Sequence, residues 1–207
     1  MTRLGLVLAI ALGMVSLSGV SLGRETEQFP DKARAQIIVS QDKQLMLIYE
    51  GEVLVRQLPI STGWPGVRKT QTPTWNGRVG EFWGTFESFG TTQDLGYWLF
   101  TDRLEGGEWN GDILIHGAPY TVDPAGVKTY SRDHIGKMPA SHGCIQLLPD
   151  DAAWFHRWDP VGVPITIRAF SGGTLIYPKI VFGAQLTGAS PAQGQLPEPT
   201  GSALTLP

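Results

Sequence analysis

The sequence has little of two things that many proteins of its size use, cysteine and charge. A single cysteine, Cys144, occurs among 207 residues, so an internal disulfide is excluded. Charged residues make up 17% of the chain, the formal net charge is −3, and no run of lysines or arginines occurs. Because nucleic-acid binding needs clustered positive charge, we expect no nucleic-acid partner.

The first residues have the pattern of an export signal. Arg3 precedes an uncharged stretch at 4–23 that ends in small residues, and the chain becomes polar at Arg24. This pattern predicts a signal peptide over residues 1–23, or an uncleaved N-terminal anchor, because the apolar stretch is long. We therefore expect an exported protein, in the periplasm or on the cell-wall side of the cytoplasmic membrane. A lone thiol is liable to oxidation there, so its presence suggests a chemical role.

The high counts of Gly (26) and Pro (15) favour turns and short strands over long helices. β-Branched and apolar runs predict strands at 35–40, 44–49 and 52–61, then at 80–86, 97–101 and 112–116, with a closing strand at 162–170. A turn-rich loop is expected between residues 61 and 80.

The clearest helix is predicted at 149–158, "PDDAAWFHRW". Pro149 suits the first turn, Asp150 and Asp151 favour the positive end of the helix dipole, and Asp159-Pro160 ends it. We expect a polar lead-in at 24–34, one β-rich domain at 35–180 and a disordered tail, rich in Pro, Gly and Ser, at 186–207.

The stretch "SHGC" at 141–144 holds the cysteine. A nucleophilic cysteine needs a base or a positive environment, and also donors for the developing oxyanion. Gly143 allows a sharp turn and close approach of a substrate. The backbone N–H groups of Gly143 and Cys144 are therefore candidate oxyanion donors.

Four histidines could supply the base. His142 lies two residues from Cys144, so in extended chain the two side chains would stand side by side. His116 ends the apolar run "DILIHG" beside a glycine, a better position, and the Gly117 carbonyl could orient it. We expect His134 to be solvated and His156 to be a surface or packing residue of the helix.

Two other interpretations of this stretch stay open. His116, His142 and Cys144 could form a zinc site with water as the fourth ligand. "SHGC" could also be a turn with a buried, inert thiol.

These residues resemble the signature of the L,D-transpeptidase catalytic domain, the YkuD-like family of bacterial cell-wall enzymes. "IHG" at 115–117 followed by "SHGCIQL" at 141–147 carries the resemblance. The opening strands, "TPTW" at 72–75, "GYWLF" at 96–100 and the segment 149–167 are also similar to that family. The resemblance implies a mainly β fold, a mixed β-sandwich or barrel-like domain with one or two short helices.

The resemblance implies a role for each matched residue. Cys144 would be the nucleophile, and His116 the proton acceptor and donor, oriented by Gly117. Gly143 and Cys144 would supply oxyanion donors. The remaining positions would shape the pocket or bind substrate: Ser141, His142, Gln146, Tyr97 and Trp98. It also implies peptidoglycan stem tetrapeptides as substrates, carbapenems as inhibitors, no cofactor or metal, and a monomer.

The sequence departs from the family at three places. Gln146 replaces the usual Arg or Asn, Trp75 replaces a glycine, and residues 120–140 form a longer insert that we expect to be a lid or substrate-side loop. The acyl acceptor stays open: a second stem, a protein, or water, which would make the enzyme a hydrolase. A wall-binding module without activity is a further alternative.

Overall fold

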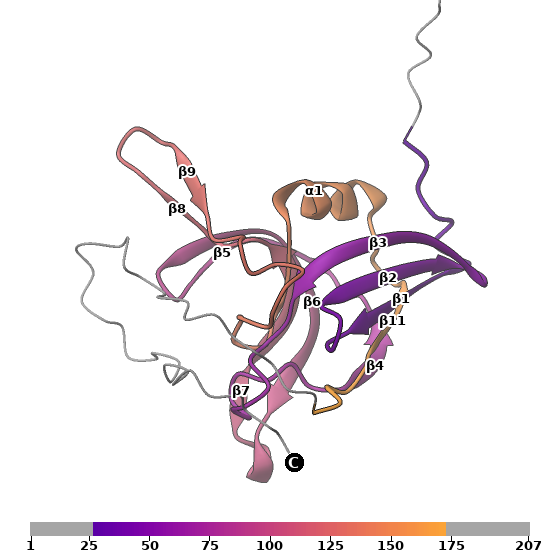
Figure 1. Ribbon diagram of the computed structural model, residues 1–207, viewed down its shortest axis with the longest axis horizontal. Helices are drawn as coiled ribbons and strands as arrows, with labels where there is room; N and C mark the ends of the chain where they lie inside the picture. Colours follow the sequence, from indigo (N-terminus) through magenta and orange to yellow (C-terminus); the bar gives the residue numbers. More distant parts are fainter. Residues whose placement is uncertain (1–26, 173–207) are drawn as a thin grey trace, which may run out of the picture.

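The computed structural model describes residues 27–172, and strands dominate this region (Figure 1). The first six strands are β1 (Ala35–Ser40), β2 (Leu45–Glu50), β3 (Val53–Ser61), β4 (Trp75–Arg78), β5 (Phe82–Ser88) and β6 (Thr91–Arg103). A short 3-10 helix, η1 (Glu105–Gly107), then precedes β7 (Trp109–Gly117), β8 (Tyr120–Val122), β9 (Lys128–Tyr130) and β10 (Ile145–Leu147). The helix α1 (Pro149–Trp158) and the strand β11 (Pro164–Ile167) follow.

The strands of residues 27–172 form one open, mixed sheet. Their order is β4-β11-β1-β2-β3-β10-β7-β6-β8-β9, and β5 pairs with β6. Most neighbours are antiparallel, but β1 pairs with β11, and β7 with β10, in parallel. Parallel neighbours need a long connection, so the β7–β10 pair brings together two segments that are distant in the sequence.

One face of the sheet carries the hydrophobic core. Alternate residues of a strand point to the same face, and those that face the core are aliphatic. Examples are Ile37, Val39, Met46, Ile48, Leu58, Ile60, Ile113, Ile115, Ile145, Leu147, Ile165 and Ile167. Full burial of such a side chain stabilises the fold by about 1.5–3 kcal/mol, which fixes which face each strand presents.

The helix α1 packs against β6 and β7 and lies beside β3 in Figure 1. It starts at Pro149, whose missing N–H costs nothing in a first turn, and its core-facing residues include Trp154 and Trp158. Trp158 Nε1 donates to the Pro30 carbonyl at 2.8 Å. Asp159, in the left-handed region with φ +53°, ends the helix.

The mainly β fold is confirmed, as are the three opening strands and the helix at Pro149–Trp158. The sheet is open rather than a closed barrel. β6 and β7 extend beyond the strands expected at 97–101 and 112–116. β4 lies inside the segment expected to be a loop, and β8 and β9 form a hairpin within the 120–140 insert. The expected signal or anchor at 1–23 and the expected tail at 186–207 lie outside the described residues.

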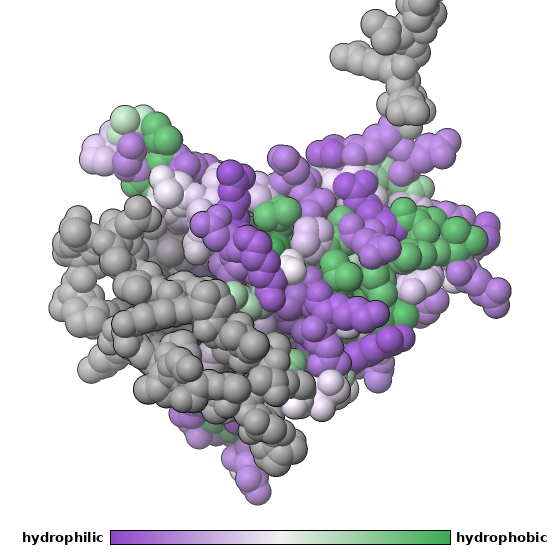
Figure 2. Space-filling model, viewed as in Figure 1, coloured by the Kyte–Doolittle hydropathy of each residue, from purple (hydrophilic) through white to green (hydrophobic). Residues whose placement is uncertain are grey.

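The described surface is mostly polar on the side that Figure 2 shows. Hydrophobic residues gather there at the end of the β2–β3 hairpin, where Val53, Leu54 and Val55 are exposed. No helix within residues 27–172 has the length and apolar character needed to cross a membrane.

Candidate active site

The parallel pairing of β7 with β10 places Cys144 next to the strand that carries His116. Ile145 pairs with Ile115, and Gln146 pairs with His116. Since Ile145 and Ile115 are both in the core, Gln146 and His116 belong to the opposite face. Cys144 immediately precedes β10, so the thiol lies where the β7–β10 ladder begins.

The sulfur of Cys144 contacts the backbone of β7. Its Sγ donates to the carbonyl oxygen of Asp112 at 3.7 Å. Burial raises the pKa of the thiol to about 11, the Leu114 backbone acts against this rise, and the Asp112 charge adds to it. The resting nucleophile at neutral pH is therefore a thiol.

His116 is 2% exposed, and its Nδ1 lies 2.7 Å from the Gly117 carbonyl oxygen. A carbonyl oxygen can only accept, so Nδ1 carries the proton and Nε2 has the lone pair that a base needs. Phe86 packs edge-on against the imidazole, with ring centroids 5.5 Å apart. Burial lowers the pKa of His116 to about 4, although the bond to Gly117 acts in the opposite direction. The ring is therefore neutral at neutral pH.

Ser141 and Thr72 hold the turn that presents the cysteine. The Ser141 hydroxyl donates to the Cys144 carbonyl and accepts from the Gly143 N–H at 3.1 Å. Thr72 Oγ1 donates to the Gly143 carbonyl and accepts from the Gly63 N–H, both at 2.7 Å. Gly143 has φ +124°, and a Cβ there would lie 2.8 Å from Ile113 Cδ1. Only glycine fits this position without strain.

Of the two backbone N–H groups expected to stabilise the oxyanion, that of Gly143 already has a partner. It donates to Ser141 Oγ, so the contribution of Gly143 to the site is the backbone conformation of the turn. The Cys144 N–H remains a predicted donor. Ser141 is 3% exposed, and its contacts support the turn rather than reach outward.

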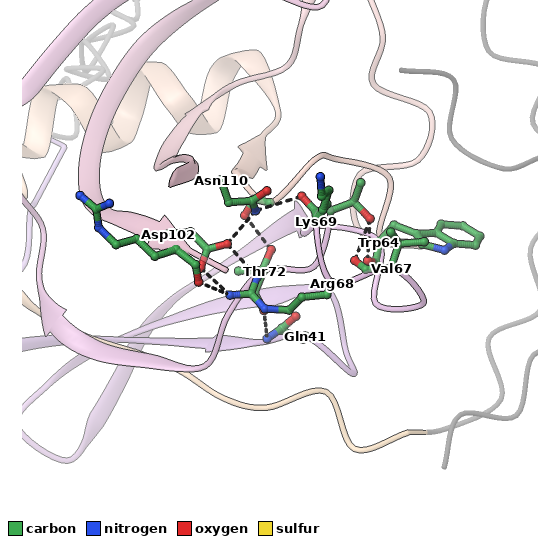
Figure 3. A network of polar contacts seen from close by, with 11 residues as sticks. Gln41, Trp64, Val67, Arg68, Lys69, Thr72, Asp102 and Asn110 are labelled. Carbon is green, nitrogen blue, oxygen red and sulfur yellow. Dashed lines mark hydrogen bonds and ion pairs between the residues drawn. The ribbon is translucent and has the colours of Figure 1, made fainter. Parts of the chain in front are cut away.

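A polar network anchors the loop that carries Thr72 (Figure 3). Arg68 forms a bidentate ion pair with the buried Asp102, with both N–O distances at 2.8 Å. Asn110 donates to Asp102 Oδ2 at 2.8 Å and to the Lys69 carbonyl at 3.1 Å. Burial alone would raise the pKa of Asp102, but the Arg68 and Asn110 bonds hold it below its ordinary value. No local sequence pattern indicates this network, because its members lie on separate segments.

His142 lies in the turn that carries the cysteine. Its ring stacks on Phe89 at the β5–β6 turn, with centroids 3.9 Å apart and an interplanar angle of 14°. His142 is partly buried, and Phe89 is exposed.

His134 corrects an expectation, because it is buried rather than solvated. It is 6% exposed, and its Nε2 lies 2.7 Å from Oε1 of Gln146. Gln146 is itself 7% exposed and is the register partner of His116. The insert at 120–140 therefore reaches the strand of the nucleophile through a buried hydrogen bond. His134 is one of several polar residues in "SRDHIGKM", and nothing in that segment indicates its contact with Gln146.

Tyr97 and Trp98 have different environments. Tyr97 is 1% exposed, lies in the core and bonds through its hydroxyl to His156 Nδ1 at 2.8 Å. The expectation that Tyr97 binds substrate is therefore wrong, because its ring points to the face away from His116. Trp98 is half-buried, and its Nε1 lies 3.4 Å from Oδ1 of Asp112, the residue whose backbone contacts the thiol.

Within residues 27–172 no three His, Cys, Asp or Glu side chains are grouped as a metal site requires. The zinc alternative therefore lacks its ligand set in this region. Cys144 Sγ instead contacts the Asp112 carbonyl oxygen, and the Gly117 carbonyl orients the His116 imidazole.

The family model for the L,D-transpeptidase catalytic domain, YkuD, matches residues 34–167. The Bacillus subtilis protein "Putative L,D-transpeptidase YciB" is 29% identical over 149 residues, which are 68% of this chain and 70% of that protein. L,D-transpeptidase 1 of Mycobacterium tuberculosis is 37% identical over 59 residues, only 28% of this chain and 19% of that protein.

Two solved structures are similar at lower identity. An L,D-transpeptidase from Mycobacterium smegmatis has a TM-score of 0.49 at 21% identity, with 66% of this chain and 59% of that one covered. The L,D-transpeptidase LdtMt1 in complex with imipenem has a TM-score of 0.47 at 21% identity, with 65% and 59% covered. This chain thus spans less than two thirds of either structure. The match of the family model over residues 34–167, together with the site it contains, shows that the chain belongs to the L,D-transpeptidase catalytic domain family.

Proposed function

We propose that this protein is a cysteine-dependent L,D-transpeptidase that acts on peptidoglycan stem tetrapeptides. The observation that carries the proposal is the parallel β7–β10 register, which places Cys144 beside the strand of a buried, oriented His116. Family membership supports the same class of reaction.

In the first step, Cys144 Sγ attacks the carbonyl of the third stem residue, the one before the terminal D-alanine. Nε2 of His116 takes the thiol proton as the C–S bond forms, because both groups start uncharged. The Cys144 N–H stabilises the oxyanion. His116 then gives its proton to the amine of the departing D-alanine, which leaves a thioester on Cys144.

In the second step, an amine of an acceptor attacks the thioester carbon. His116 Nε2 takes a proton from the attacking nitrogen, an amide forms as the C–S bond breaks, and His116 passes this proton to the sulfur. Water in place of the amine would give a free carboxylate, and the enzyme would then be a hydrolase. We place the reaction outside the cytoplasm, which the signal pattern at 1–23 supports.

Product analysis tests this proposal. Purified protein is mixed with disaccharide-tetrapeptide, and the products are identified by mass spectrometry beside those of Cys144→Ala. We expect dimers that lack one D-alanine, and none from the variant. Loss of D-alanine without dimers would indicate hydrolysis, and unchanged substrate would contradict the proposal. Localisation is tested separately, by fractionation of cells that express the tagged full chain.

A further inference from the structure

The residue whose backbone contacts the thiol carries a carboxylate, and the first step of the proposed reaction does not use this group. Asp112 is on β7, two residues before Leu114 and four before His116, so its side chain shares the His116 face of the sheet. Its backbone oxygen is the group that Cys144 Sγ contacts at 3.7 Å. Asp112 is half-buried, so its charge is only partly screened by water.

Two donors from β6 fix this carboxylate. Thr101, the register partner of Asp112, donates to Oδ1 at 2.6 Å, and Trp98 Nε1 lies 3.4 Å from the same oxygen. No ion pair among residues 27–172 involves Asp112. The two described aspartates of β6, Asp94 and Asp102, both have cationic partners. Asp112 is thus held in place by Thr101 and Trp98 and has no cationic partner in the described part of the chain.

This charge is unfavourable for the nucleophile itself. A carboxylate near the sulfur opposes formation of the thiolate, and Asp112 does contribute to the raised pKa of Cys144. Two other side chains on this face of the sheet are uncharged, because His116 is neutral and Gln146 is an amide that bonds to His134. Along β7, the carboxylate of Asp112 therefore lies four residues before an uncharged His116.

We propose that Asp112 binds the positively charged amine of the acyl acceptor. This inference rests on the proposed function and specifies the acceptor that it leaves open. A carboxylate attracts an ammonium group, and this attraction is weaker when the amine carries its own carboxylate next to the nitrogen. The preferred acceptor is accordingly a lysine-type primary amine with no carboxylate next to it.

In the transfer step, the acceptor bound at Asp112 loses two protons from its nitrogen. The bound ammonium first releases one proton to water and becomes a free amine. Its nitrogen attacks the thioester carbon on Cys144, and the C–S bond breaks. The second nitrogen proton passes through Nε2 of His116 to the sulfur, which yields an amide and the thiol. Asp112 acts by charge alone and exchanges no atom.

The test compares wild-type full chain with Asp112→Asn, which can still accept from Thr101 but lacks the charge. Acyl-enzyme is formed from disaccharide-tetrapeptide, and the ratio of amide to hydrolysis product is measured by mass spectrometry. Two nucleophiles are used: Nα-acetyl-lysine amide, which is cationic, and hydroxylamine, which is uncharged at neutral pH. Asp150→Asn, an exposed carboxylate on α1, is the matched control for a change in net charge.

We expect the ratio for the lysine derivative to fall about tenfold in Asp112→Asn, the size of a hydrogen-bonded charge contact. The ratio for hydroxylamine should stay the same, and acylation should be as fast or faster because the negative charge is gone. Added salt should lower the lysine ratio of the wild type but not of Asp112→Asn. Asp150→Asn should behave as the wild type.

An unchanged lysine ratio in Asp112→Asn would overturn the inference while the proposed function stands. An equal fall for hydroxylamine would also overturn it, because the role of Asp112 would then be structural. If the wild type formed no acyl-enzyme, the proposed function would fail first and this inference with it.

Discussion

Alkylation of Cys144 should be slow at neutral pH and should accelerate steadily up to high pH. The chain has one cysteine, so every alkylation event reports on this thiol. Burial first, and then the nearby Asp112 charge, raise its pKa to about 11. His116, with a pKa lowered by burial to about 4, carries no charge that could stabilise the thiolate in the free enzyme.

The size of the effect follows from these values. A free cysteine with a pKa of about 8.5 is roughly 10% thiolate at a pH of about 7.5, whereas a pKa of about 11 reduces the thiolate about 300-fold. A more basic thiolate is a better nucleophile, which restores a factor of about 10. Alkylation of folded protein at that pH should therefore be about 30-fold slower than that of the unfolded chain.

The assay is iodoacetamide alkylation followed by intact mass, from a pH of about 6 to about 10, with the same protein unfolded in urea as the control. The unfolded rate should level off above the ordinary cysteine pKa of about 8.5. The folded rate should rise about tenfold per pH unit throughout this range. His116→Gln should alkylate as the wild type does but lose turnover of tetrapeptide. A fast folded rate that levels off near neutral pH would refute the reasoning, because it would reveal a preformed thiolate–imidazolium pair.

Three further predictions concern the stability of the residues around the site. Gly143→Ala places a Cβ at φ +124° against the core, so we expect it to lower the free energy of unfolding, measured by urea denaturation, by about 1–3 kcal/mol. The variant should also lose most of its activity. A stable, active variant would contradict the claim that only glycine fits this turn. His134→Phe should lower the free energy of unfolding by about 1–3 kcal/mol, because it leaves the buried Oε1 of Gln146 without a hydrogen-bond donor. His134→Gln, which keeps a donor, should recover part of this loss. Equal stability of both variants would show that the hydrogen bond contributes little. The pKa of His116 in the folded protein is below its ordinary value of about 6.5, so protonation of this residue favours the unfolded state. Between neutral pH and a pH of about 5, the wild type should therefore lose about 2 kcal/mol of unfolding free energy because of His116. His116→Gln should lack that part of the acid loss in urea titrations at the two pH values, and an identical pH slope would exclude this effect.

The sequence predicted the local elements best where one pattern determined them. The strands of the opening meander and the helix at Pro149–Trp158 follow from alternating apolar residues and from the helix-start signals of Pro149 and the two aspartates after it. β4 and the β8–β9 hairpin were missed because turn-rich composition concealed short strands whose pairing is decided by distant partners. Trp75, for example, pairs with Ile167.

Residue type and strand position predicted Cys144 as nucleophile and His116 as base, and these roles stay predictions. The expected contact of His116 with the Gly117 carbonyl is present. The contacts that support the site were harder to predict. Tyr97 is buried because its face of β6 packs against the helix. Both faces of β6 carry apolar residues, so the sequence did not indicate which face would do so. The bond between His134 and Gln146 joins an insert to a strand, and no local spacing indicates such a contact.

The central claim is that Cys144 carries the acyl group of a stem peptide. The most direct measurement is intact mass of the full chain, followed by peptide mapping, during turnover of disaccharide-tetrapeptide. The account predicts a mass increase equal to the substrate minus D-alanine, located on Cys144 and removed by hydroxylamine as a thioester would be. Turnover that proceeds without such an adduct, or equally well in Cys144→Ala, would contradict it.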